Sequence, residues 1–285
     1  MTPTLVRQHL PHAGAESRVD PGARARDWSE IQERMLVPLH ETVYERLQVG
    51  PATRLLGLGC GSGLSLLMAA SRGAAVTGVE SRCAERLALA RERLLVEASG
   101  TRARAATRLI DGGPADAADA ETPPYNLVTA FEPIGCLAGD SEGLSELITA
   151  AVPLTERGAP VVLAGWGPPE RCATSSVLRV ATRPAEPMRT TGGWRPALRD
   201  DLEEVAQRAG LRPDGSGRVS CPFGYADLDS AVRGLLSTGL FDAAISATDQ
   251  EQVDKELVEA LHAHQRPDGT VWMPNVFRYL VARTP

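Results

Sequence analysis

The chain has 285 residues, of which 43% are hydrophobic and 23% charged, a composition that fits a folded globular protein and excludes wholesale disorder. Its formal net charge of −6 disfavours nonspecific binding to nucleic acid. The single lysine, Lys255, lies outside any Gly-Lys-Ser/Thr sequence, which excludes a P-loop.

The cysteines and the hydropathy of the chain indicate which further classes of protein are disfavoured. Five widely spaced cysteines without a Cys-x-x-Cys pair indicate neither a disulfide framework nor a metal site. No run approaches about 18 apolar residues, and the amino-terminal residues lack the apolar stretch of a signal peptide. We therefore expect a cytoplasmic protein with no metal, no membrane contact and no nucleic-acid partner.

The first 165 residues show a regular succession of elements. Residues 1–27 have no clear period, and we expect a loose arm there. Apolar residues every four positions, from Ile31 to Leu47, predict a helix that Pro38 starts or kinks. The strands predicted next cover 54–58, 74–79, 105–110, 125–131 and 159–164, and the helices between them cover 64–70, 82–98 and 144–152. This alternation predicts a parallel sheet with helices on both faces.

The remaining residues are mixed. The patterns predict a helix over 197–209, a strand over 219–223, a mainly helical region over 227–264 and a final strand region over 271–282. A helical insertion between two late strands is the simplest reading. With no internal repeat and no linker in view, we expect a single domain over residues 1–285.

A glycine cluster is the strongest chemical signal. Gly57, Gly59, Gly61 and Gly63 stand between a predicted strand and a predicted helix. Glycine allows a tight turn and a close approach of the backbone to a ligand, and the helix start offers free N–H groups to an anion. About 20 residues later, Glu80 ends the second strand, where a carboxylate can accept hydrogen bonds from ribose hydroxyls.

The spacing of these glycines discriminates between nucleotide ligands. The dinucleotide fingerprint Gly-x-Gly-x-x-Gly/Ala fails in every frame, because its last position falls on Ser62, Leu64 or Leu66. A nicotinamide or flavin enzyme is therefore disfavoured. The Gly-x-Gly-x-Gly loop with a downstream acid instead resembles motif I of the class I S-adenosylmethionine-dependent methyltransferases.

Further segments carry the same resemblance. Asp111-Gly112 follows the third strand, where that family places an acid near the adenine amino group. Residues 125–132 resemble the fourth-strand motif Phe-Asp-x-Val, with Asn126 in place of the usual Asp, and residues 154–163 resemble the fifth strand. The sequences around Trp28, 221–223 and 275–279 look like a bacterial subgroup associated with small-molecule and secondary-metabolite tailoring.

The resemblance implies a Rossmann-like three-layer sandwich with a mostly parallel seven-stranded sheet. It divides the chain into an N-terminal arm and helices (1–50), a cofactor-binding core (51–165), and late strands with a helical lid around 227–264 (166–285). The implied cofactor is S-adenosylmethionine. The residues implied to bind it are Trp28, Gly57, Gly59, Cys60, Gly61, Gly63, Glu80, Ser81, Asp111, Gly112 and Phe131.

Methyl transfer from a sulfonium needs mainly alignment, which can supply roughly 7–11 kcal/mol of the barrier. Glu132, just past the fourth strand, is either a general base or a solvated carboxylate. His40 is a second catalytic candidate, although a histidine on a helix surface is the commoner outcome. Cys60 is expected to pack within the glycine loop and to be no nucleophile. Among the tryptophans that could line an acceptor pocket, Trp272 is expected to pack in the core.

One departure from the family separates two hypotheses. Gly57 stands where the family usually has Asp or Glu, whose carboxylate helps hold the amino group of the cofactor's methionine part. The first hypothesis is methyl transfer to an oxygen or nitrogen of a small-molecule acceptor, such as a natural-product intermediate. The alternative is a cyclase or rearrangement enzyme that binds the cofactor without transferring its methyl group, and an inert nucleotide-binding partner is a third reading. The sequence leaves the choice between monomer and homodimer open.

Overall fold

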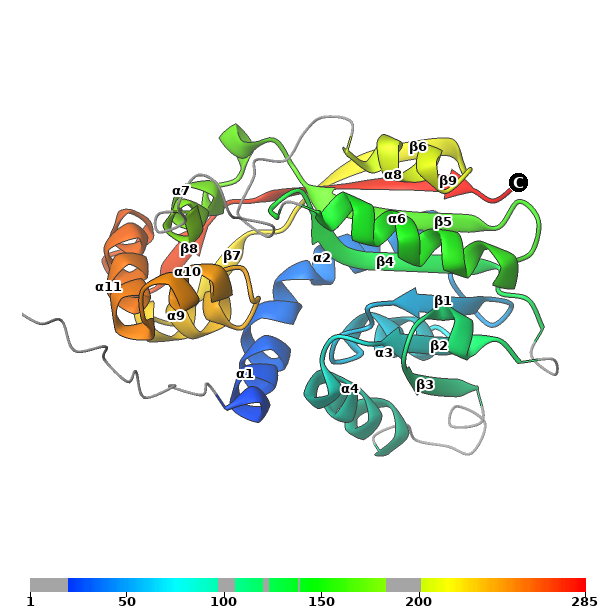
Figure 1. The fold of residues 1–285 in the computed structure, drawn as a ribbon, viewed down its shortest axis with the longest axis horizontal. Helices are drawn as coiled ribbons and strands as arrows, with labels where there is room; N and C mark the ends of the chain where they lie inside the picture. The colour runs from blue at the N-terminus through cyan, green and yellow to red at the C-terminus, as the bar shows by residue number, and fades with distance from the viewer. Residues whose placement is uncertain (1–19, 97–105, 120–122, 138, 183–200) are drawn as a thin grey trace, which may run out of the picture.

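At the centre of the molecule lies a seven-stranded sheet with helices on both faces (Figure 1). The structure is a computed structural model, and it describes residues 20–96, 106–119, 123–137, 139–182 and 201–285. The strands of the sheet are β1 (Arg54–Leu58), β2 (Ala75–Glu80), β3 (Thr107–Asp111), β4 (Leu127–Ile134), β5 (Pro160–Trp166), β6 (Arg212–Ser220) and β9 (Val276–Arg283).

The strand order is β3-β2-β1-β4-β5-β9-β6. Strands β1 to β5 are mutually parallel, and β9 is antiparallel to both of its neighbours, β5 and β6. This confirms the expected mostly parallel, Rossmann-like sheet. The order reverses between β1 and β4, and the crevice at the carboxyl ends of such strands is where sheets of this kind bind ligands.

Each face of the sheet has its own cluster of buried side chains, because successive strand residues point to opposite faces. Leu55 packs on one face with α2 (Val37–Arg46), α3 (Leu64–Ser71) and α4 (Ala84–Arg91), and Leu56 packs on the other with α6 (Asp140–Ala151) and α8 (Asp201–Arg208). Helix α4 continues as a π-helical turn, Glu92–Val96. The remaining short helices are Pro114–Ala117, Val152–Leu154, Pro169–Arg171, α7 (Thr174–Leu178), Arg179–Thr182 and His262–His264.

Much of the segment before β1 is helical, which corrects the expectation of a loose arm for its described part. Helix α1 (Pro21–Asp27) is followed by a π-helical segment (Trp28–Gln32), a 3₁₀ turn (Glu33–Leu36) and α2. Asp20 caps α1 by accepting a hydrogen bond from the Gly22 amide, and Pro21 suits the first turn. The helical region therefore begins at Pro21, ten residues before Ile31, where the four-residue apolar pattern starts. Residues 1–19 of the expected arm lie outside the described residues.

The late region contains the expected helical insertion. Helices α9 (Leu228–Leu236), α10 (Asp242–Ala247) and α11 (Gln250–Leu261) lie between β7 (Phe223–Tyr225) and β8 (Val271–Met273), which pair as a separate two-stranded sheet. The two predicted late strands are each divided, and the breaks fall at Pro222 and Pro274, which have no N–H to donate to a ladder.

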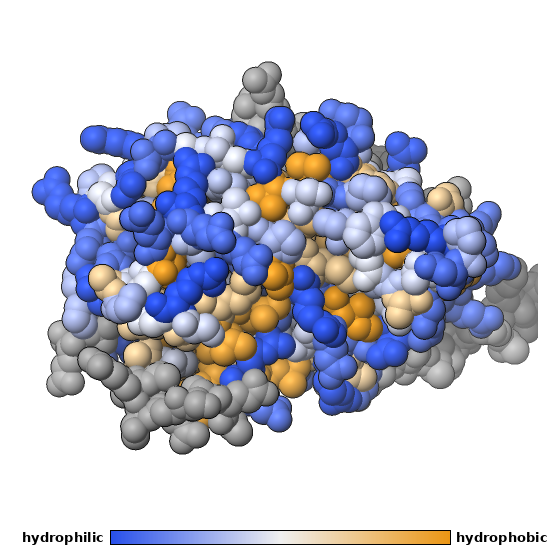
Figure 2. Space-filling model, turned by 180° about the vertical axis from the view of Figure 1, so that it is seen from behind, coloured by the Kyte–Doolittle hydropathy of each residue, from blue (hydrophilic) through white to orange (hydrophobic). Residues whose placement is uncertain are grey.

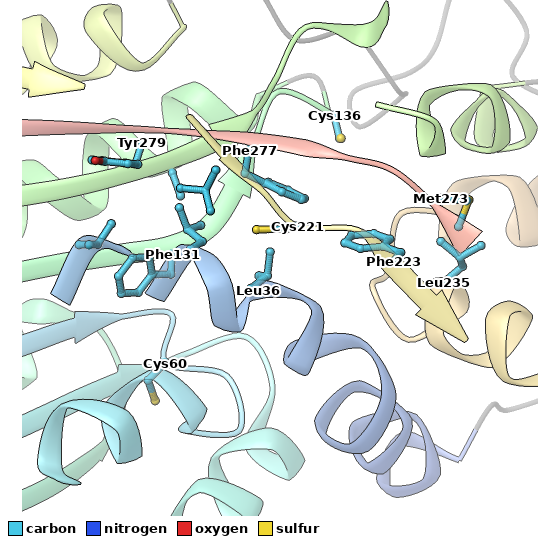
Figure 3. Close-up of a cluster of buried hydrophobic side chains, with 14 of the residues drawn as sticks. Leu36, Cys60, Phe131, Cys136, Cys221, Phe223, Leu235, Met273, Phe277 and Tyr279 are labelled. Atoms are coloured by element: carbon cyan, nitrogen blue, oxygen red, sulfur yellow. The ribbon is translucent and has the colours of Figure 1, made fainter. Parts of the chain in front are cut away.

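One cluster of buried apolar side chains runs from the sheet into this helical region (Figure 3). Phe131, near the end of β4, lies beside α2, whereas Phe223 and Phe277 lie farther along with ring centroids 5.9 Å apart. Trp272 does not join this cluster, which corrects the expectation that it packs in the core. Its ring is 38% exposed and lies under the Arg266 guanidinium.

The face seen in Figure 2 is mostly hydrophilic, with apolar residues gathered near its middle. Within the described ranges, no helix is both long enough and apolar enough to cross a membrane.

Candidate active site

The glycine loop follows β1 and turns directly into α3. Gly59, Gly61 and Gly63 have φ angles of +60°, +56° and +80°, a region that residues with a side chain rarely adopt. The Cys60 amide donates to the Val79 carbonyl over 3.1 Å, which fixes the loop to β2. The sequence motif therefore marks a real left-handed turn at the carboxyl edge of the sheet.

Gly57 plays a different part, because it lies inside β1 and is buried. A Cβ atom on it would lie 2.8 Å from Cδ2 of Leu66. A core leucine thus occupies the space into which a side chain at this position would point. A carboxylate at this position would require the Leu66 side chain to shift.

The Glu80 carboxylate lies at the end of β2 and is only 4% exposed. Its Oε2 accepts a hydrogen bond from the Gly61 amide over 3.1 Å, and its Oε1 accepts one from the Arg82 amide over 2.9 Å. Each carboxylate oxygen has a second lone pair, so both can accept another hydrogen bond. Glu80 therefore shapes the glycine loop and still has acceptor capacity for a ligand.

Asp111 is the last residue of β3, in register with Glu80, and its side chain is exposed at the same edge. The Gly112 amide donates to the Glu80 carbonyl over 3.1 Å, which joins the ends of the two strands. A Cβ on Gly112, whose φ is +148°, would meet Oδ2 of Asp116 at 2.3 Å. The structure thus brings Glu80, Asp111 and Gly112 together with the glycine loop.

Glu132 is a residue of β4, which runs three residues farther than predicted. Its carboxylate forms an ion pair with Arg82, a residue that the sequence reading did not single out. Ser81 is exposed and lines the same cavity as Gly59 and Glu132, while the preceding Phe131 ring is buried against α2. Glu132 thus lies within β4 and not just past it as predicted, and its role in ligand binding stays a prediction.

Three cavities meet at Glu132. One of about 450 Å³ also contacts Gly59, Ser81 and Arg82, and one of about 410 Å³ contacts Glu80, Arg82 and residues of α1 and α4. The third, about 60 Å³, is bounded largely by apolar side chains, namely Trp28, Leu36, Pro133, Trp166, Phe223, Leu240 and Phe277. A ligand with one polar part and one apolar part could thus contact the same carboxylate from neighbouring cavities.

The N-terminal segment covers the glycine loop with polar side chains. Trp28 lies in the π-helical turn, and its indole Nε1–H is buried without a hydrogen-bond partner. Glu33 is 5% exposed and accepts hydrogen bonds from the Ser62 hydroxyl and from Arg93, the latter over 2.8 Å. Oε1 of Glu33 and Nε1 of Trp28 would be 3.2 and 3.3 Å from a Cβ on Gly61. Sequence reasoning missed Glu33, Arg82 and Arg93, because only the tertiary fold brings them to the loop.

His40 is buried, which corrects the expectation of a surface position. Burial lowers the pKa of its imidazole to about 3, so the ring is neutral at ordinary pH. The ring contacts Phe131 at a centroid distance of 4.5 Å, and its Nδ1 has no hydrogen-bond partner. His40 does not line any of the three cavities at Glu132, and its catalytic role stays a prediction.

Cys60 is a buried residue of the glycine loop. Burial raises the pKa of the Cys60 thiol to about 12, which keeps it protonated. The described ranges contain no group of three or more His, Cys, Asp or Glu side chains placed to hold a metal ion.

This sheet order, with its glycine loop and the acids at the ends of β2 and β3, defines the chain as a Rossmann-like protein with the fold of class I methyltransferases. A candidate methyltransferase from Bacillus halodurans superposes with a TM-score of 0.53 at 12% identity, over 86% of this chain and 98% of that chain. The Escherichia coli protein YjhP gives 0.52 at 16% identity, over 92% and 99%.

A third similar structure contains S-adenosylmethionine. Phosphoethanolamine N-methyltransferase 2 of Haemonchus contortus, in complex with S-adenosylmethionine, superposes with a TM-score of 0.50 at 15% identity, over 92% of this chain and 56% of that one. No family model and no curated protein matches the sequence itself.

Proposed function

We propose that the protein binds S-adenosylmethionine and transfers its methyl group to an oxygen or nitrogen atom of a small molecule. The observation that carries this proposal is the convergence of the left-handed glycine loop, Glu80 and Asp111 at one edge of the sheet, beside the cavities that meet at Glu132.

The residues at this edge suit the cofactor. Glu80 would accept hydrogen bonds from the ribose hydroxyls, and Asp111 would accept one from the adenine amino group; their adjacent positions in the register of β2 and β3 support these roles. The absence of side chains at Gly59 and Gly61 lets a ligand approach the loop closely. The unpartnered N–H of Trp28 would find an acceptor in the carboxylate of the methionine part. A buried donor without a partner costs about 1–3 kcal/mol, which favours a ligand that supplies one.

When bound, S-adenosylmethionine supplies an electrophilic methyl group on a positively charged sulfur. The chain's own contribution is to hold an acceptor in line with it and to exclude water. Glu132, which borders every one of the three cavities, is placed to accept the proton that a hydroxyl or ammonium acceptor loses. General bases of this kind contribute typically 10²–10⁴-fold to the rate.

The apolar cavity supports an acceptor with a small apolar group. Its wall combines Trp28 from the N-terminal segment, Trp166 from β5, Phe223 from β7 and Phe277 from β9. The lid helices close it through Leu240, between α9 and α10. A tailoring step on a natural-product intermediate fits such a site.

Calorimetric titration with S-adenosylmethionine tests the proposal. Saturable binding at one site is expected, and a second assay follows S-adenosylhomocysteine formation with candidate acceptors. If the intact chain binds neither S-adenosylmethionine nor S-adenosylhomocysteine, the proposed function is wrong.

A cyclase or rearrangement enzyme is the second candidate, and Gly57 is the observation that favours it. With Leu66 in place of the family's carboxylate, one contact to the methionine part is lost. An enzyme that only retains the cofactor can tolerate that loss. Product formation without S-adenosylhomocysteine would favour this reading over methyl transfer.

A further inference from the structure

Arg82 and Glu132 form an ion pair directly over the glycine loop. Arg82 follows β2 by two residues, and Glu132 lies in β4, so the pair joins two strands on either side of β1. Nη2 of Arg82 and Oε2 of Glu132 would each be 3.5 Å from a Cβ on Gly59. Because Gly59 has no side chain, the two charges lie against the bare backbone of the loop.

The pair stands between the two larger cavities of the site. Both Arg82 and Glu132 line the cavity of about 450 Å³ and also the cavity of about 410 Å³. The side chains are 62% and 40% exposed, so water screens the pair and it holds weakly. A cationic ligand group at this point can therefore displace Arg82 from Glu132 at little cost.

The other charged groups of these cavities have their own described partners. Arg24 pairs with Asp242 over 2.6 Å. Arg86 donates to the Ser237 carbonyl over 2.7 Å and lies over the Trp28 ring. The Glu80 carboxylate accepts two backbone amides. Among the described residues that line the site, Arg82 is thus the cation that neutralises Glu132.

This inference rests on the proposed function. We propose that Arg82 is a resident cation that the sulfonium of S-adenosylmethionine replaces beside Glu132, so that Glu132 attracts the charged cofactor and Arg82 limits its advantage over neutral S-adenosylhomocysteine. A carboxylate released from Arg82 regains a cation only when the bound ligand carries the positive charge. With the uncharged product in place, Arg82 stays paired with Glu132, so only the charged cofactor has to displace the guanidinium.

Charge-changing variants make the inference measurable. In Arg82→Gln the carboxylate has no competing cation, so the affinity for S-adenosylmethionine rises relative to that for S-adenosylhomocysteine. In Glu132→Gln the attraction for the sulfonium is lost, so the ratio of the two affinities falls. Each change is expected at about threefold to tenfold, the size of one screened charge interaction.

The experiment measures dissociation constants for both ligands by calorimetry on the full chain, at low and at high salt. Arg82→Lys keeps the charge and should keep the affinity ratio within about twofold of wild type. Arg283→Gln removes an exposed arginine paired with Asp214 at the opposite end of the sheet, and it should leave the ratio unchanged. The wild-type preference for S-adenosylmethionine should shrink as salt rises.

The outcomes separate the inference from the proposed function. If wild type binds both ligands and Arg82→Gln leaves their affinity ratio unchanged, the inference is overturned and the proposed function stands. If wild type binds neither ligand, both are overturned. Retained binding of S-adenosylhomocysteine by the variants shows that they are folded, so a changed ratio reports on charge.

Discussion

The buried carboxylate of Glu33 accepts a hydrogen bond from the hydroxyl of Ser62, although the two residues are 29 positions apart. The same oxygen accepts a hydrogen bond from Arg93, which also donates to the Ser62 carbonyl over 2.8 Å. The N-terminal segment, the glycine loop and the continuation of α4 are thereby joined at one point.

Replacement of Glu33 by alanine is expected to destabilise the chain strongly. The Glu33 side chain is 7% exposed and that of Arg93 is 19% exposed, so the variant leaves a largely buried guanidinium without its carboxylate. Removal of one partner of such a pair typically costs about 3–5 kcal/mol of unfolding free energy. Urea denaturation measures the loss.

Asp214→Asn is the matched control for Glu33→Ala. Asp214 pairs with Arg283, but both side chains are nearly half exposed. That loss should stay below about 1 kcal/mol. Equal losses in the two variants would contradict the structural role of Glu33.

Gly61→Ala should weaken cofactor binding. Gly61 has a φ of +56°, and its new Cβ would press on Glu33 and Trp28. Gly158 makes a matched control, because its φ is +71° but a Cβ there meets open space. Both variants should lose about 1 kcal/mol of stability to backbone strain. A calorimetric titration should show at least a tenfold loss of S-adenosylmethionine affinity in Gly61→Ala and no comparable loss in Gly158→Ala. An equal loss of affinity in both variants would show that Gly61 has no particular role in binding the cofactor.

Trp28→Phe separates ligand binding from folding. The variant removes a buried N–H that has no partner in the protein, so thermal stability without ligand should be unchanged or slightly higher. The affinity for S-adenosylmethionine should fall about tenfold, as expected for a lost hydrogen bond to a carboxylate. Unchanged affinity would show that the indole N–H makes no contact with the ligand.

His40 should make stability depend on pH. Burial lowers the pKa of its imidazole to about 3, whereas in the unfolded chain the pKa returns to its ordinary value of 6.5. Below pH 6.5 the unfolded state binds a proton that the folded state does not bind. Unfolding free energy should therefore fall by about 1.4 kcal/mol per pH unit between pH 6 and pH 4 through this group.

His40→Met isolates this contribution, since it fills a similar volume without a titrating group. The slope of unfolding free energy against pH should be shallower in the variant than in wild type. His262→Met, at an exposed position, should keep the wild-type slope. Equal slopes in wild type and His40→Met would mean that His40 takes up protons freely in the folded state.

The parts of the fold that could be predicted are those with a local pattern. A few consecutive residues are enough to predict the apolar strands β1, β2, β4 and β5 and the glycine loop. Strand β6 was largely missed, because Arg212–Gly217 contains proline, aspartate and two glycines and reads as a turn. As an edge strand paired only with β9, it tolerates Pro213, which a central strand would not.

Some residues of the candidate site could likewise be predicted from local sequence, and others could not. Glu80 and Asp111 could be placed because each ends a recognisable strand, and parallel strands end at a common edge. The pairs Arg82–Glu132 and Glu33–Arg93 join residues 50 and 60 positions apart. No local spacing indicates which charges meet across such distances. The burial of His40 likewise depends on how α2 packs on Phe131, which the helical period alone does not determine.

The position of β9 governs the order in which the chain can fold during synthesis. Strand β9 lies between β5 and β6, and among the described strands β6 pairs with β9 alone. While a ribosome is still making residues before Val276, β1 to β5 can already pair, but β6 has nothing to pair with. The edge of β5 then stays open until β9 arrives. A nascent chain that stops before Val276 thus exposes a strand edge on which another chain could pair.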